Sequence, residues 1–165
     1  FVLLLRLIFM AYQNPNLARA VGLESGFPLI GYRSVAKNLE LTADNAEDIG
    51  NIALDATDNT LDVDGSTMRR IREFTDQVDE ITATAVEAVV ERDYDKAIAV
   101  GRMYEEITDR EMELIRSLPD MPKVELLRTR EVLVSLQQTA QYAMRNAEIA
   151  ANLALNEESE HVTIE

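Results

Sequence analysis

The sequence predicts an all-α fold of tandem antiparallel three-helix bundles, the first of them incomplete. Apolar residues recur at steps of three and four over long stretches, which is the helical period, and no segment shows the alternation of a half-buried strand. The four prolines fall at the breaks between these stretches. Because short connections join long helices, we expect consecutive helices to lie antiparallel.

The first part of the chain predicts an apolar helix and then a long one. The segment from Phe1 to about Tyr12 is too short for a membrane span of about 20 residues and is interrupted by Arg6, so we expect a core helix. One helical turn is expected over Leu17–Val21. A long helix is expected from near Leu29 to about Thr57, with an apolar stripe at Ile30, Val35, Leu39, Ala43, Ala46, Ile49 and Ala53.

Three further helices complete the expected fold. The first begins after a cap at Asp64 or Ser66 and runs to about Arg92, where a tight turn over Arg92–Asp95 follows. The next ends near Leu118, before two prolines, and the last runs from near Val124 to about Leu155. The expected units are therefore residues 1–57, the end of a first bundle, and 58–155, a complete bundle. Residues 156–165 are expected to be a disordered acidic tail.

An internal repeat supports this division. A shift of 97 residues aligns the last long helix of each half and places Arg33 on Arg130 and Thr42 on Thr139. Most of the other matches are small apolar residues, which two alanine-rich helices also acquire by convergence. We interpret the pattern as a duplication.

The charge of the chain excludes several classes of function. There are 30 acidic and 16 basic residues, a net charge of -14, and such a surface repels nucleic-acid phosphate. Only three of the basic residues are lysines, and this favours a protein adapted to high salt, with an ordinary acidic helical protein as the alternative. The absence of cysteine and a single histidine, His161, exclude thiolate and histidine chemistry. No targeting signal is visible, which favours a cytoplasmic location.

Carboxylates at helical spacing are the candidate metal ligands. Glu40, Asp44 and Asp48 follow one another at steps of four, so they share a face of the expected helix. Glu105 and Asp109 form a second such pair. Like charges at this spacing repel, and a hard cation such as Mg, Mn or ferric iron reverses the sign of the interaction. The alternative is a solvated acidic face, neutralised by Arg33 or Lys37.

The segment Leu39–Ala46 resembles the acidic helical motif of the PhoU family of phosphate-uptake regulators. Glu40 and Asp44 fall on the acidic positions of the motif, while Asn45 stands where the family has histidine. Residues 105–110 are similar to the acidic segment of the family's second helix, and an alternative register places Tyr104 and Thr108 at its acidic positions. In the second copy of the repeat, Gln137 and Gln141 replace the carboxylates.

The resemblance implies a function without enzyme chemistry. A PhoU-like protein would regulate phosphate uptake and homeostasis by contact with a phosphate ABC transporter or with a signalling kinase or transcription regulator. It would form a homodimer and hold iron, zinc, manganese or magnesium on acidic pairs, here Glu40 and Asp44 above all. The resemblance also identifies the opening helix as the end of the second helix of a first repeat whose earlier part lies outside this chain, in a protein of haloarchaeal type.

Two alternatives of other classes stay open. One is a helical interaction module with no role in phosphate regulation, since bundles host many functions. The other is a carboxylate-bundle metalloenzyme. That chemistry usually relies on two Glu-x-x-His motifs on facing helices, and a chain with one histidine, His161, does not supply two.

Overall fold

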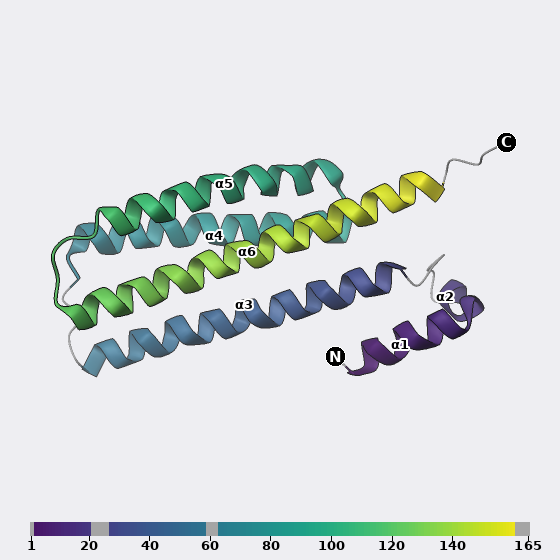
Figure 1. Ribbon diagram of the computed structural model, residues 1–165, viewed down its shortest axis with the longest axis horizontal. Coiled ribbons are helices and arrows are strands. Elements are labelled where there is room, and N and C mark those ends of the chain that lie inside the picture. Colours follow the sequence, from purple (N-terminus) through teal and green to yellow (C-terminus); the bar gives the residue numbers. More distant parts are fainter. Residues whose placement is uncertain (1, 21–26, 59–62, 161–165) are drawn as a thin grey trace.

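A three-helix bundle with a fourth long helix along one side forms the body of the protein. The computed structural model describes residues 2–20, 27–58 and 63–160. Helices α4 (Gly65–Glu91), α5 (Tyr94–Arg116) and α6 (Lys123–Glu160) pack against one another, and α3 (Phe27–Asp58) lies antiparallel along α6 (Figure 1). The described residues contain no strand, so the all-α prediction is confirmed.

Apolar side chains of α4, α5 and α6 form the bundle core. Phe74 and Ile81 of α4, Val100 and Leu114 of α5 and Leu133 of α6 are completely buried. Removing each such side chain from water contributes about 1.5–3 kcal/mol, so these side chains hold the three helices together. The backbone of the described part of α3 packs along α6 and α1 (Val2–Gln13), while Val35 and Ile49 add their side chains to the bundle core. The main interhelical seam of α3 is therefore the one with α6.

Aspartate side chains cap the N-terminal ends of α4 and α5. The carboxylate of Asp64 accepts hydrogen bonds from the backbone N–H groups of Ser66, at 2.8 Å, and Thr67, at 3.0 Å. Hydrogen bonds from the hydroxyl groups of Ser66 and Thr67, together with these backbone bonds, hold the pKa of Asp64 below its usual value. Asp93 caps α5 by accepting from the backbone N–H of Lys96 at 2.9 Å. The predicted cap at Asp64 is confirmed.

The turn between α4 and α5 also reaches α3. Arg92 adopts a left-handed conformation with φ of 53°, and its Nε and Nη2 atoms donate to the Tyr32 hydroxyl at 3.3 and 3.1 Å. Lys96 lies at the same corner and pairs with Glu87 and Glu91, each at 2.8 Å. Both carboxylates raise the pKa of Lys96. Tyr32 thus links α3 to the corner between α4 and α5.

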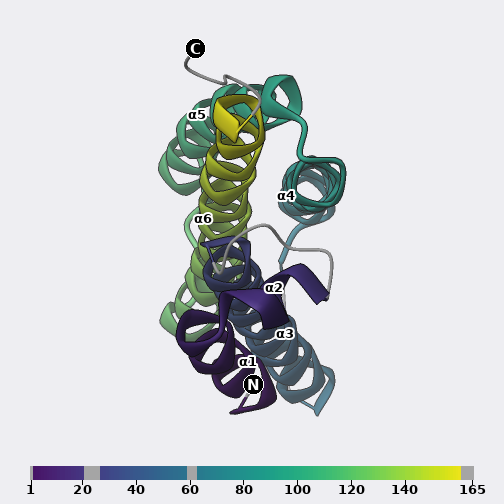
Figure 2. The same ribbon diagram turned by 90° about the vertical axis from the view of Figure 1, so that its right-hand side faces the viewer.

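Two expectations about the ends of the chain are corrected. The opening helix was expected to be buried, but Ala11 is its only buried residue among those described, because α1 contacts only α2 (Pro15–Ala20) and α3 (Figure 2). Helix α6 continues to Glu160, five residues beyond the expected end at Leu155. The start of the expected disordered tail is therefore helical, and its last residues, 161–165, lie outside the described part of the chain. Val21 of the predicted turn lies outside it too.

Candidate functional site

The seam between α3 and α6 fixes which face of α3 reaches solvent. Asn38 Nδ2 donates to Asn146 Oδ1 at 2.8 Å, and Asn45 Nδ2 donates to the Thr139 hydroxyl at 3.1 Å. The second pair lies seven residues on in α3 and seven residues back in α6, so the contact repeats every two turns of two antiparallel helices. All four residues are buried.

Gly31 lies one further step of seven along the same seam. A Cβ atom built on Gly31 would lie 3.0 Å from Ile149 Cγ2 and 3.6 Å from the Leu153 side chain. The missing side chain therefore lets the start of α3 approach the end of α6 closely.

This seam corrects the apolar stripe expected on α3. Leu39, Ala43, Ala46 and Ala53 are exposed, whereas the neighbouring asparagines Asn38 and Asn45 face α6. A shift of one residue is a rotation of about 100° around a helix. Apolar periodicity misses this face because its central residues are polar and satisfy one another by hydrogen bonds.

The predicted carboxylate row is accessible as a result of this rotation. Glu40, Asp44 and Asp48 are all exposed on α3. Glu40 forms a salt bridge of 3.0 Å with Lys37, which is one of the two neutralising contacts that the solvated-face alternative names. Steps of three or four residues continue the row to Asn51 and Asp55. The sequence analysis missed Asp55, although the helical spacing that identified the row also reaches this residue.

The second predicted pair lies elsewhere. Glu105 and Asp109 are exposed on α5, and α5 does not contact the described part of α3, so the two acidic sets do not meet. Instead Tyr104 faces α6, where its hydroxyl accepts a hydrogen bond from Gln137 Nε2 at 3.2 Å. Tyr104 is therefore the residue of this segment whose side chain contacts α6. Further along α5, burial raises the pKa of Glu111.

The described residues do not form the carboxylate cluster that the family resemblance implies. No group of three or more carboxylate or histidine side chains within residues 2–20, 27–58 and 63–160 is placed to hold a metal ion. Glu40 and Asp44 are two donors on one exposed helix, without a facing pair from another element. Metal binding at these residues remains a prediction, and no step of the function proposed below depends on it.

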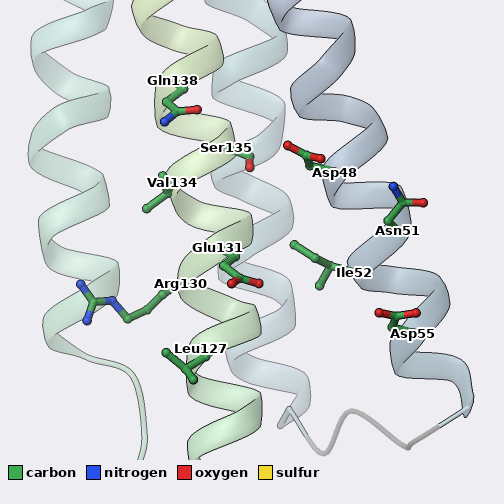
Figure 3. Close-up of a pocket in the computed structure, with 10 residues that line it drawn as sticks. All are labelled: Asp48, Asn51, Ile52, Asp55, Leu127, Arg130, Glu131, Val134, Ser135 and Gln138. Atoms are coloured by element: carbon green, nitrogen blue, oxygen red, sulfur yellow. The ribbon is translucent and has the colours of Figure 1, made fainter.

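A groove of about 560 Å³ runs beside this row, between α3 and α6 (Figure 3). Asp48, Asn51, Ile52 and Asp55 line it from α3. The α6 side consists of Leu127, Arg130, Glu131, Val134, Ser135 and Gln138. Two of these residues are apolar and accessible: Leu127 is 61% exposed and Val134 is 44% exposed. The groove therefore combines accessible apolar side chains with carboxylates on both walls.

Comparisons with known proteins give no match, whether with protein-family profiles, with curated proteins or with solved structures. Within the described residues, no helix is both long enough and apolar enough to span a membrane.

Proposed function

We propose that this protein is a PhoU-like regulator of phosphate uptake that acts through contacts with other proteins. One observation carries the proposal. Glu40 and Asp44, the two residues of Leu39–Ala46 that resemble the acidic motif of the family, are exposed on the face of α3 opposite to the α6 seam. Asn45, at the family's histidine position, instead faces the seam and bonds to Thr139. The acidic residues are thus available to a partner, while their neighbour anchors the helix.

The packing of α3 on α6 also supports the proposal. These are the two helices that the 97-residue shift relates to each other. Copies of one helix related by a two-fold axis perpendicular to the helices pack antiparallel, as α3 and α6 do. A duplicated unit with a shared central seam is what the resemblance to tandem PhoU repeats implies. The partners that follow from it are components of a phosphate ABC transporter, or a signalling kinase or transcription regulator, with a homodimer as the expected assembly.

The protein would regulate phosphate uptake by presenting the exposed face of α3 to a partner as a rigid surface. The α3 face is held by buried hydrogen bonds to α6, and α6 is held by the bundle core. A partner that contacts the exposed carboxylates therefore meets a preformed surface, which lowers the conformational cost of binding. Coupling of phosphate status to transport needs no bond-making step in this chain.

The proposal is tested by disrupting the gene in its own host and measuring uptake of radiolabelled phosphate at high external phosphate. We expect uptake to change, and to return to the original rate when the intact gene is restored. Uptake of an amino acid serves as the control and should not change. Equal phosphate uptake with and without the gene would contradict the proposal.

A second candidate function is an interaction module without a phosphate role. The exposed apolar side chains of Leu127 and Val134 in the groove favour it, because contiguous exposed apolar surface marks binding sites for other proteins. The gene disruption separates the two: a module of this kind leaves phosphate uptake unchanged while its partner binding is lost.

A further inference from the structure

We infer that the groove between α3 and α6 is a docking site for a basic amphipathic helix of a partner protein. The inference goes beyond the proposed function, because it depends on the shape and charge of the groove and not on any role in phosphate regulation. It is carried by the apolar residues exposed on α6, by the carboxylates on both walls and by the open form of the groove.

The first step is the apolar row on α6. Val124, Leu127 and Val134 are 56%, 61% and 44% exposed and lie at steps of three and seven residues, so they share one side of the helix. From Val124 to Val134, ten steps along the helix, the axis rises about 15 Å, which matches about three turns of a docked helix. Leu127 and Val134 line the groove together with Ile52 of α3. A partner helix with apolar residues at steps of three and four would cover this row.

The second step is the charge around that row. Asp48 and Asp55 line the α3 wall and Glu131 lines the α6 wall. Figure 3 shows Glu131 extending toward α3 and Asp48 toward α6, whereas Arg130 points away from these carboxylates. None of the three carboxylates forms a salt bridge with another described residue. Lysine and arginine side chains flanking an apolar stripe would therefore find acidic partners on both sides.

The charge also decides between occupants. A second copy of this chain would bring its own Asp48, Asp55 and Glu131 against the same carboxylates, and a chain of net charge -14 gains nothing from that approach. An anionic membrane surface is repelled for the same reason. Of these three occupants, only a basic amphipathic helix brings positive charge for the carboxylates together with apolar side chains for Leu127, Val134 and Ile52.

The test uses the full chain and a fluorescein-labelled 18-residue peptide of leucine and lysine, with leucines at steps of three and four. Binding is measured by fluorescence anisotropy at the lowest KCl concentration that preserves full helicity. A peptide with glutamate in place of lysine, and one of the same composition with leucines all around the helix, serve as peptide controls. We expect the first peptide to bind at least tenfold more tightly than either control.

Matched variants locate the binding surface. Asp48→Asn, Asp55→Asn and Glu131→Gln together should weaken binding at least tenfold. Asp76→Asn, Asp79→Asn and Glu80→Gln, which remove the same charge from exposed positions of α4, should change it less than twofold. Leu127→Asn with Val134→Asn should also weaken binding at least tenfold, whereas Val90→Asn with Ile98→Asn, at exposed positions of α4 and α5, should not.

Three outcomes would overturn the inference. In the first, the peptide fails to bind. In the second, the α4 charge variants weaken peptide binding as much as the groove variants do, which would show electrostatic attraction without a defined site. The third is dissociation of a dimer by the groove variants in sedimentation, which would assign the groove to a second copy of the chain.

Discussion

Asn38 of α3 and Asn146 of α6 form a buried hydrogen bond of 2.8 Å across 108 residues of sequence. Asn146 is only 2% exposed, so neither amide can find water if the other is removed. Two buried amides that satisfy each other specify both the register and the direction of two packed helices, because a slip by one residue leaves both unpaired. The orientation of the acidic face of α3 follows from this pair.

Substitution of Asn38 by alanine should therefore destabilise the protein. It leaves the Asn146 amide buried without its partner, at a cost of about 1–3 kcal/mol in the free energy of unfolding. Replacement of both asparagines by leucine should restore most of that stability, since no polar group is then left unpaired. Asn51→Ala, at an exposed position of the same helix, should change stability by less than about 0.5 kcal/mol. Urea unfolding followed by circular dichroism measures all three, and equal effects of Asn38→Ala and Asn51→Ala would contradict the role of the pair.

The cap of α4 predicts a dependence of stability on pH. The pKa of Asp64 is lowered in the folded protein from its usual value of 3.8. Its stabilising contribution is therefore present above that usual value and is lost as the pH falls through the lowered one. Asp64→Asn keeps an acceptor for the backbone but carries no charge, so its cap does not titrate. We expect the Tm difference between the wild type and Asp64→Asn to shrink as the pH falls from about 6 to about 2. A difference that stays constant over this range would show that the charge of Asp64 does not contribute.

Helix positions could largely be predicted from the sequence, but not which side of each helix is buried. The long helix expected from near Leu29 to about Thr57 is Phe27–Asp58 in the structure, because proline and polar breaks mark its ends. The buried stripe of α4, centred on Phe74, Val78 and Ile81, was also predictable, since it is purely apolar. On α3 the same reasoning found Val35 and Ile49, which join the core, but it missed Asn38 and Asn45, because these are buried in pairs with partners about 100 residues away.

The candidate site was predictable in part, because helical spacing can be predicted from the sequence and contacts between distant helices cannot. The spacing of Glu40, Asp44 and Asp48 depends on local helical geometry alone, and the three side chains do share an exposed face. Whether Tyr104 or Glu105 faces α6 depends on how α5 is rotated in the bundle, and the structure places Tyr104 against Gln137. The groove residues Leu127 and Val134 are apolar, so the sequence alone does not show that they stay accessible. Their exposure, 61% and 44%, is seen only in the assembled α3–α6 pair.

Salt concentration should control the stability of this chain. Its 30 acidic residues outnumber its 16 basic ones, so the excess negative charges repel one another. Salt shortens the range of that repulsion from about 10 Å at 0.1 M to about 3 Å at 1 M. We expect helicity to fall when KCl is lowered from the molar range to about 0.1 M. The circular dichroism signal at 222 nm checks this expectation. Full helicity at the lower concentration would contradict the adaptation to high salt.

Glu40 and Asp44 are the residues at which we expect any stoichiometric metal to bind. Elemental analysis of protein purified without chelators should find about one metal ion per chain, which would be iron, zinc, manganese or magnesium. The variant that combines Glu40→Gln with Asp44→Asn should lose this metal ion. Both positions are exposed, so the variant should keep the helicity of the wild type. Asp76→Asn with Glu80→Gln is the charge-matched control and should retain the metal. Unchanged metal content in the first variant would place the site elsewhere.

The proposed regulation depends on the exposed acidic face of α3, and charge variants of that face test the dependence. In the disrupted strain, phosphate uptake is measured after complementation with Glu40→Gln, Asp44→Asn and Asp48→Asn combined, and with Asp76→Asn, Asp79→Asn and Glu80→Gln combined. We expect the second set to restore the original rate and the first set not to restore it, although both proteins are folded and present in equal amounts. Full restoration by the first set would contradict a regulatory role of this face.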